Sequence, residues 1–275
     1  MIVEAMSPSR LNTHRDCEAR YYFHYHEGLN SPPSMAMVRG TVIDEASNNT
    51  LTGVIEGHLT SREDIVEQTV HDWDARSDEI EWDFARDGKP SLVRESIPKG
   101  TRLAYDDLWM ELEPKEVQPR IRYDIEDEGF VLPIQGYADV IESNGTIRDL
   151  KTASRKWNRG REFNETQAKV YVGQTFHELK DVNKAPFVYD ILVMTPAGRK
   201  VYLDQRELTV TREQVEFVWR EMIIRAKRVL HTMDMLEHGS PRDAIIPNRE
   251  SFLCSQRHCG FWELCVTEFG GTVRE

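Results

Sequence analysis

The stretch Gly136-Tyr137-Ala138-Asp139-Val140-Ile141, followed closely by Asp149-Leu150-Lys151-Thr152, decides how this chain is interpreted. Between the two lies Ser143-Asn144-Gly145, and apolar and polar residues alternate on both sides of it. Asn-Gly between two alternating runs is a strong signal for a β-hairpin. The sequence therefore predicts that Asp139 lies on the incoming strand and Asp149 on the outgoing strand.

The turn determines whether these two carboxylates share a face. On a strand, residues two apart point to the same side, so Asp149 and Lys151 project together and Leu150 points into the core. A two-residue turn would pair Asp139 with Leu150, whereas a three-residue loop would pair Asp139 with Asp149. Only the second arrangement brings the carboxylates together, so we predict a three-residue loop in which Gly145 has a positive φ.

Two carboxylates on neighbouring strands repel each other unless a cation lies between them, and hard oxygen ligands suit Mg²⁺ or Mn²⁺. Such a cation would polarise a phosphodiester and lower the pKa of a bound water. Lys151 would orient or deprotonate that water and offset charge on the phosphate in the transition state. The alternative is a surface hairpin whose charges are ordinary and solvated.

Several other segments occur in an order that resembles a known family. The chain resembles RecB-type nuclease domains of the PD-(D/E)XK superfamily, and is most similar to the CRISPR-associated RecB-like exonucleases and the nuclease domain of AddB. Besides the hairpin, the resemblance rests on Ser7–Thr13, Cys17–Phe23, Gly40–Ala46, Gln167–Tyr171 and a C-terminal group of cysteines. It implies a restriction-endonuclease-like core.

Hydrophobic periodicity independently indicates an α/β fold with a mixed central β-sheet flanked by helices. We expect a single domain over 1–275, with a helical insertion at about 58–114 and a C-terminal cysteine cluster at 250–269. The expected helices cover 9–26, 36–57, parts of 61–114, 163–180 and 209–237, and the expected strands cover 116–125, 130–142, 146–151, 187–194 and 199–204.

The resemblance extends the metal site beyond the hairpin. It implies that Asp44, Asp139 and Asp149 hold the cation, with the backbone carbonyl of Leu150 as a further ligand. At the position of Asp44 the family usually has a histidine, but a carboxylate is an equally suitable ligand for a hard divalent cation. Glu116 matches an acid often present in the family and is a weaker candidate ligand.

A helical face is expected beside this site. Gln167 and Tyr171 are four residues apart and therefore share one side of the predicted helix. The resemblance implies that they contact the scissile strand or the metal shell. Without the resemblance, Tyr171 would be interpreted as a core residue.

The chain has four cysteines, and three of them fall within one short C-terminal segment. In an intracellular protein such a group suggests metal ligation rather than disulfides, although zinc and unligated thiols remain alternatives. The resemblance implies a [4Fe-4S] cluster that joins the two chain ends, held by Cys17, Cys254, Cys259 and Cys265.

Charge restricts where nucleic acid could bind. The net charge of −12 argues against broad attraction to DNA. Between 151 and 161, however, the chain has five basic residues and no acidic one. We place the DNA path there, with Trp157 as a stacking platform; the alternative is a basic loop that pairs with acidic neighbours. The predicted DNA-binding residues are Arg155, Lys156, Trp157, Arg159 and Arg161.

The size and composition fit a compact enzyme. The chain has 275 residues, 39% of them hydrophobic, and no Pro/Gly-rich linker divides it. It has no apolar run of membrane-spanning length, and Met1–Met6 lacks the features of a secretory signal. We expect a cytoplasmic protein with no membrane partner.

The expected function is that of an Mg²⁺- or Mn²⁺-dependent deoxyribonuclease, an exonuclease acting on single-stranded DNA or DNA ends. Protein partners would come from recombination, repair or CRISPR adaptation. The alternative is a DNA-end-binding or adaptor module that retains the fold but cuts poorly.

Overall fold

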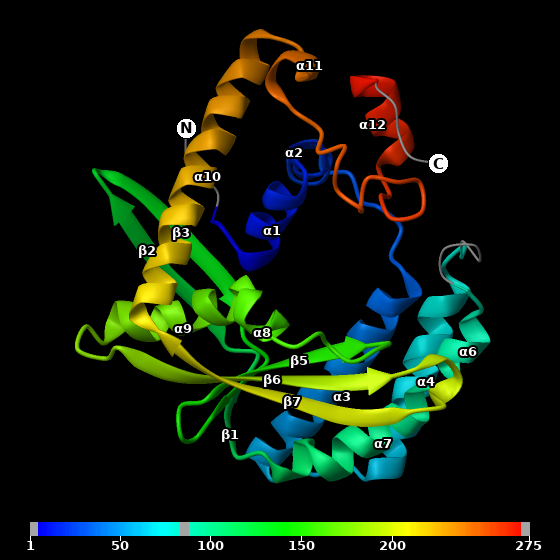
Figure 1. Ribbon diagram of the computed structural model, residues 1–275. Helices are drawn as coiled ribbons and strands as arrows, with labels where there is room; N and C mark the ends of the chain where they lie inside the picture. The colour runs from blue at the N-terminus through cyan, green and yellow to red at the C-terminus, as the bar shows by residue number, and fades with distance from the viewer. Residues whose placement is uncertain (1–4, 83–87, 271–275) are drawn as a thin grey trace. The chain divides into compact units, whose positions relative to one another are not determined.

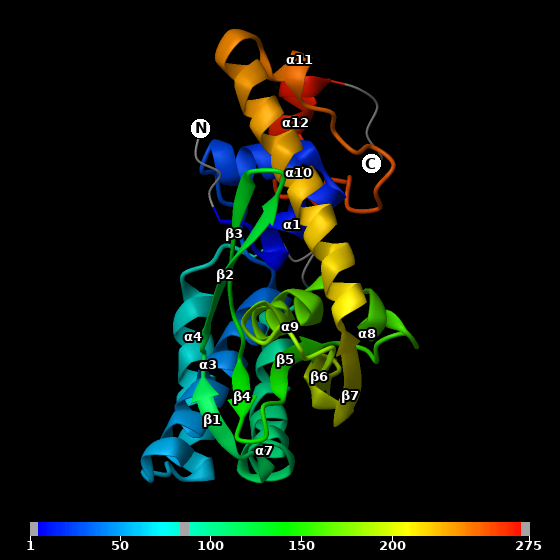
Figure 2. The ribbon, with the colours of Figure 1, turned by 90° about the vertical axis from the view of Figure 1, so that its left-hand side faces the viewer.

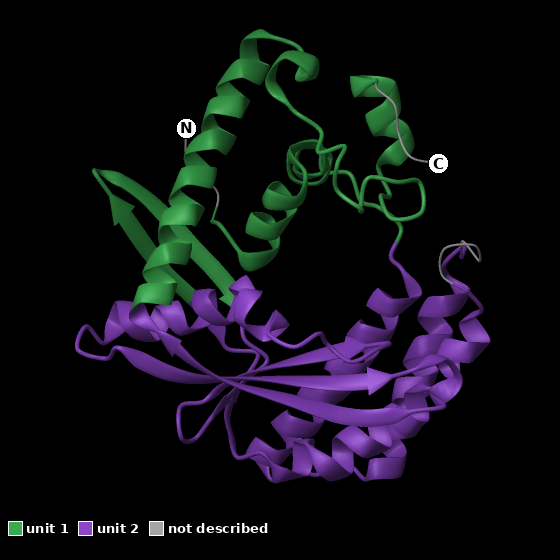
Figure 3. Cartoon of the chain, in the orientation of Figure 1, with its two compact units in different colours: residues 1–32, 122–136, 213–275 green, residues 33–121, 137–212 purple. Residues whose placement is uncertain are grey.

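The computed structural model describes residues 5–82 and 88–270. They form two compact units, coloured separately in Figure 3. One unit comprises Met1–Pro32, Arg122–Gly136 and Glu213–Glu275, and the other comprises Pro33–Ile121 and Tyr137–Arg212. The expectation of a single domain with an insertion stays a prediction, and residues 83–87 of that insertion lie outside the described residues.

The larger unit, Pro33–Ile121 with Tyr137–Arg212, is built on a five-stranded sheet with the strand order β1-β4-β5-β6-β7. Strands β5 and β6 are parallel and the other neighbouring pairs are antiparallel, which confirms the predicted mixed central sheet. The strands are β1 (Pro114–Val117), β4 (Val140–Glu142), β5 (Ile147–Ala153), β6 (Lys184–Met194) and β7 (Val201–Thr211).

Helices flank both faces of this sheet (Figures 1 and 2). Helices α3 (Met35–Glu56) and α7 (Ile97–Asp107) pack on one face, and α9 (Thr166–Glu178) packs on the other. Strand β6 is buried on both sides and is mainly apolar; its buried Asp190 is paired with Arg148. Its residue Leu192 faces the cluster around α3, whereas Tyr189 contacts α9 through the amide of Ala168.

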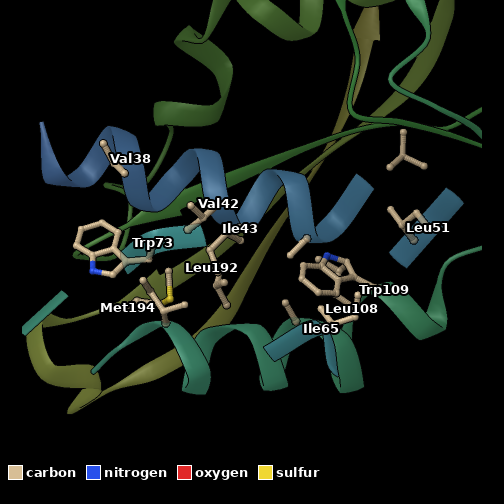
Figure 4. Close-up of a cluster of buried hydrophobic side chains, with 14 of the residues drawn as sticks. Val38, Val42, Ile43, Leu51, Ile65, Trp73, Leu108, Trp109, Leu192 and Met194 are labelled. Carbon is tan, nitrogen blue, oxygen red and sulfur yellow. The ribbon is translucent and has the colours of Figure 1, made fainter. Parts of the chain in front are cut away.

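The main hydrophobic core of this unit lies between α3, α7 and the sheet (Figure 4). Trp73, Trp109 and Ile43 are almost completely buried there. The approach of α7 to the sheet requires a glycine, because a Cβ at Gly100 would overlap the sulfur of Met194. Helix α4 (Arg62–Asp78) packs against α3 and α7, and the short helices α6 (Pro90–Arg94), η2 (Trp109–Glu111) and η3 (Pro196–Gly198) complete the helical side.

Three predicted strands are wrong in their extent. The strand predicted at 199–204 continues as β7 to Thr211, so the helix predicted from 209 begins only at Arg212. The other two are each divided. The predicted strand 116–125 is divided into β1 and β2 (Arg120–Asp127), and the predicted strand 130–142 is divided into β3 (Phe130–Tyr137) and β4. Gln118 has a φ of 51°, and Pro119 has no amide to donate, so the first strand cannot continue. The amide of Ala138 donates to the carbonyl of Pro119, so both strands break at the same place.

The smaller unit contains the two-stranded sheet β2-β3 and the N- and C-terminal helices. Ser7 caps the N-terminus of helix α1 (Pro8–Asp16): its hydroxyl accepts a hydrogen bond from the amide of Arg10. Cys17 has extended backbone and ends α1. The remaining helices are α2 (Glu18–Tyr21), the π-helix η1 (Tyr22–His26), α10 (Arg212–His238), α11 (Pro241–Ala244) and α12 (Trp262–Phe269). None of the helices in the described part of the chain is long and apolar enough to cross a membrane.

Candidate active site

The β4–β5 hairpin carries the site and has the predicted register. Val140 pairs with Arg148 and Ile141 pairs with Ile147, so Asp139 and Asp149 occupy opposite positions at the end of the ladder. Gly145 has a φ of 86°, which confirms the three-residue loop and the positive φ.

Asp139 is fixed by hydrogen bonds from two directions. The amide of Leu150 donates to its Oδ2 over 2.6 Å, and Nε2 of Gln118 lies 3.5 Å from its Oδ1. Burial and then the nearby Asp149 raise the pKa of Asp139 above that of an ordinary carboxyl. A cation beside it would reverse this shift.

Asp149 is completely buried, with 0% of its surface exposed. Its Oδ2 contacts Nζ of Lys151, and neither carboxylate oxygen has any other hydrogen-bond partner among the described residues. Burial raises the pKa of Asp149 although Lys151 opposes the shift. For Lys151, burial favours the neutral amine, but Asp149 and Asp139 outweigh it and raise the pKa. The ammonium of Lys151 therefore neutralises an otherwise uncompensated buried acid.

Asp44 reaches the same region from α3. That helix lies close to β5, because a Cβ at Gly40 would be 3.3 Å from the hydroxyl of Thr152. Burial raises the pKa of Asp44, and the charge of Lys151 lowers it. Neighbouring Glu45 instead forms a half-exposed ion pair with Arg76 over 2.7 Å.

The three aspartates are near one another but do not form a compact donor group. Among the described residues, only Asp234, Glu237 and His238 of α10 bring their donor atoms within 4.8 Å of one another. In the hairpin, Lys151 lies against Asp149 where a cation would otherwise bind. A cation that binds Oδ2 of Asp149 would displace the Lys151 ammonium, whereas Oδ1 has no hydrogen-bond partner among the described residues.

The face of α9 that was predicted to border the site is present. Nε2 of Gln167 donates to the hydroxyl of Tyr171 over 2.9 Å. Tyr171 is 5% exposed, and burial raises the pKa of its hydroxyl, with further contributions from Asp149 and Asp139. Tyr171 is thus a buried residue whose hydroxyl is close to the carboxylates, and its role in contacting a substrate stays a prediction.

Glu116 lies on β1, opposite Ile141, and its side chain is 50% exposed. Its carboxylate lies 3.6 Å from the amine of Lys115. The residue of this segment that reaches Asp139 is Gln118. The sequence analysis missed Gln118. Its side chain reaches the site because the strand breaks at Pro119, and that break was not predicted.

Glu165 is a second residue that the sequence analysis missed. It precedes α9, and its carboxylate is close enough to Asp149 and Lys151 to raise the pKa of both. Nε of Arg161 donates to its Oε1 over 2.8 Å. The sequence did contain a signal for it: Glu165 lies two residues before Gln167, near the start of the helix predicted at 163–180.

The predicted basic segment is mostly exposed, but Trp157 is not. Trp157 is 7% exposed, packs on Tyr189 with ring centroids 5.3 Å apart, and is covered by Arg161 at 4.3 Å. The prediction of a stacking platform at Trp157 is therefore wrong, because the buried ring anchors the segment to β6.

The basic residues of the segment differ from Trp157 in their exposure. Arg155 and Arg159 are exposed. Lys156 lies 3.8 Å from Asp204.

The four cysteines meet in the smaller unit, where Cys17, Cys254, Cys259 and Cys265 line a single cavity together with Phe23, Phe261 and Trp262. No disulfide joins them. Burial raises the pKa of Cys265 to about 11, and the other three thiols contribute. Four thiols around one cavity are the donor set of a four-thiolate cluster. No three of their sulfur atoms lie within 4.8 Å of one another, so as placed they do not form a tetrahedral zinc site.

Comparison with known proteins agrees with this architecture. A protein from Eubacterium rectale, provisionally described as an exonuclease, has a crystal structure that matches with a TM-score of 0.50 and 19% identity, over 82% of this chain and 81% of its own. The crystal structure of SSO0001 matches with a TM-score of only 0.28 and 19% identity, over 40% of this chain and 50% of its own. No curated protein sequence matches.

The family model described as the PD-(D/E)XK nuclease superfamily matches residues 5–266. This range includes the hairpin, the α9 face and all four cysteines. The chain therefore belongs to the PD-(D/E)XK nuclease superfamily.

Proposed function

We propose that this protein is a divalent-metal-dependent deoxyribonuclease of the RecB-like type, acting as an exonuclease on single-stranded DNA or DNA ends. One observation carries the proposal: within the described part of the chain, the completely buried Asp149, opposite Asp139, has no hydrogen-bond partner other than Lys151. Burying a carboxylate with so few hydrogen bonds lowers the stability of the fold. Such carboxylates occur mainly at functional sites.

The chemistry of the donors, three carboxylates and a carbonyl, suits a hard divalent cation, which would draw the three aspartates together. Asp44, Asp139 and Asp149 would hold Mg²⁺ or Mn²⁺ through carboxylate oxygens, with the backbone carbonyl of Leu150 as a further ligand. A cation bound there supplies Lewis-acid polarisation of a phosphodiester and lowers the pKa of a coordinated water.

The protein's own residues supply the remaining functions. Lys151, once released from Asp149, would lie beside the reacting phosphate, where its Nζ can orient the attacking water and offset negative charge. Gln167 and Tyr171 would contact the scissile strand from α9. Arg155, Lys156, Arg159 and Arg161 would bind phosphates at the rim.

The four thiols around the cavity would hold a [4Fe-4S] cluster that ties Cys17 to the C-terminal segment, with zinc as the alternative. An anaerobic absorption spectrum combined with iron, sulfide and zinc analysis distinguishes the two. A folded, colourless, iron-free protein would overturn the cluster proposal.

The nuclease proposal is tested with end-labelled single-stranded DNA and Mn²⁺. Lys151→Ala and Asp149→Asn should each slow cleavage by about 100-fold or more, the usual contribution of a general acid or base. Lys227→Ala is a matched control, since Lys227 forms an exposed ion pair with Asp127 in the other unit. Cleavage by Lys151→Ala at the wild-type rate would show that the activity does not come from this site and would reject the assignment. Absence of cleavage by the wild type would favour an adaptor that only binds DNA ends.

A further inference from the structure

An exposed aromatic residue lies in the segment where Trp157 is buried. Phe163 of α8 (Arg161–Asn164) is 61% exposed, whereas Trp157 is 7% exposed. Exposing a large aromatic ring to water is unfavourable by itself. A ring exposed among basic residues is the combination used to bind single-stranded nucleic acid.

The backbone of Phe163 is held rigidly. Lys169 is buried, and its Nζ donates to the carbonyl of Phe163 over 2.5 Å and to that of Glu165 over 2.7 Å. On the other side, the guanidinium of Arg161 stacks on Trp157. Burying an ammonium costs free energy unless hydrogen bonds satisfy it. The two carbonyls that accept from Lys169 satisfy it, and these hydrogen bonds fix the position of α8. The exposed ring thus projects from a preorganised helix, which reduces the entropy lost on binding.

The surroundings of Phe163 match a nucleic-acid strand. Arg155 and Arg159 are exposed and form no ion pair with any described residue, so they can bind phosphates. Glu165, two residues after Phe163, is close enough to Asp149 and Lys151 to affect both electrostatically. Phe163 therefore lies in the segment between an exposed arginine, Arg159, and a carboxylate that acts on the candidate catalytic residues.

We infer that Phe163 is the platform on which a base of single-stranded DNA stacks beside the active site. The inference rests on the proposed function, because it assigns the substrate contact of that same site. It also explains the buried Trp157, which supports the helix that presents the ring. A phosphate bound by Arg155 or Arg159 would hold the strand while the base covers Phe163.

The test measures binding without cleavage, by fluorescence anisotropy of a labelled oligothymidylate in EDTA, with a matched oligonucleotide of abasic sites. Phe163→Leu should weaken binding of the oligothymidylate by about 5- to 140-fold, the range for loss of one stacked base. Its binding of the abasic oligonucleotide should be unchanged. Phe163→Trp should bind the oligothymidylate at least as tightly as the wild type.

The matched control is Phe217→Leu, which removes an aromatic side chain of almost equal exposure, 62%, from α10 in the other unit. Equal affinities of Phe163→Leu and wild type for the oligothymidylate would overturn the inference, as would an equal loss with the abasic oligonucleotide or tighter binding of the matching oligoribonucleotide. Because the assay needs no hydrolysis, a protein that stacks bases on Phe163 but never cuts DNA would overturn only the proposed function.

Discussion

The main-chain amide of Leu150 in β5 donates a 2.6 Å hydrogen bond to Oδ2 of Asp139, which directly precedes β4 rather than lying within a strand as predicted. A hydrogen bond from a backbone amide to a carboxylate is strong and fixes the acceptor. The position of Asp139 is thereby coupled to the register of the hairpin. A change of register by one residue would remove this hydrogen bond and point one of the two carboxylates away.

The first prediction concerns the loop that sets the register. Gly145 has a φ of 86°, and a Cβ there would meet no atom within 4 Å. Gly145→Val should therefore destabilise the protein only through its backbone conformation, by about 1 to 3 kcal/mol. Urea unfolding measures this change. Gly145→Asn is the control, because asparagine tolerates positive φ and should lose less than the valine variant. Wild-type stability of Gly145→Val would show that the loop does not require the glycine.

The register was predictable because it depends on local information. The alternation of apolar and polar residues, the Asn-Gly pair and the need for Asp139 and Asp149 to share a face all lie within a short stretch. Leu150 also packs against the core as its position between Asp149 and Lys151 predicted.

Features that depend on distant contacts were not predictable in the same way. Trp157 is buried because Tyr189 of β6 packs against it, and the local sequence does not contain that contact. The strand break at Gln118 and Pro119 is stabilised by Ala138, almost 20 residues later. Sequence alone showed alternating residues there and predicted one continuous strand.

The second prediction concerns pH in the metal-free protein. Burial raises the pKa of Asp139 and of Asp149 in the folded state. From the ordinary carboxyl pKa of about 3.9 upward, the folded protein then binds more protons than the unfolded chain. The free energy of unfolding should therefore fall as pH rises through this window. Urea unfolding in EDTA over a series of pH values measures the slope, and Mn²⁺ should remove the decline by binding the deprotonated acids.

Asp149→Asn should reduce that slope, because it removes one of the two titrating carboxyls. Asp127→Asn is its control, since Asp127 is 45% exposed and paired with Lys227 in the other unit. Stability in EDTA that is constant or increases from pH 4 upward would contradict this interpretation of the site.

The third prediction concerns the ion pair between Arg161 and Glu165, whose Nε and Oε1 are 2.8 Å apart. The carboxylate of Glu165 also acts on Asp149, so it adds negative potential at the proposed cation site. Glu165→Gln should weaken Mn²⁺ binding about 5-fold, equivalent to about 1 kcal/mol. Arg161→Gln should have the opposite effect on Mn²⁺ binding, because it leaves Glu165 without its counter-ion.

Titration of Mn²⁺ followed by electron paramagnetic resonance reads this affinity without any cleavage. The exposed ion pair of Arg94 with Asp74 supplies the control Asp74→Asn, which should leave the affinity unchanged. Changes of the same sign in Glu165→Gln and Arg161→Gln would show that the pair does not act through charge.

The last prediction concerns the four thiols. Cys259 and Cys265 line the same cavity as Cys17 and Cys254, so loss of any one thiol should abolish a four-thiolate cluster. Cys254→Ala should lose its bound iron and unfold at a lower temperature, since metal binding contributes to folding free energy. A loss of about 3 kcal/mol corresponds to a Tm lower by about 6 to 12 °C in a protein of this size.

Ser255→Ala is the matched control, because Ser255 follows Cys254 directly and its hydroxyl has no hydrogen-bond partner in residues 5–82 and 88–270. It should keep both the iron and the Tm of the wild type. The cavity belongs to the smaller unit, whereas Asp139, Asp149 and Lys151 belong to the larger one. Mn²⁺ binding by Cys254→Ala below its Tm should therefore equal that of the wild type. A variant that keeps its full iron content would show that Cys254 is not a ligand.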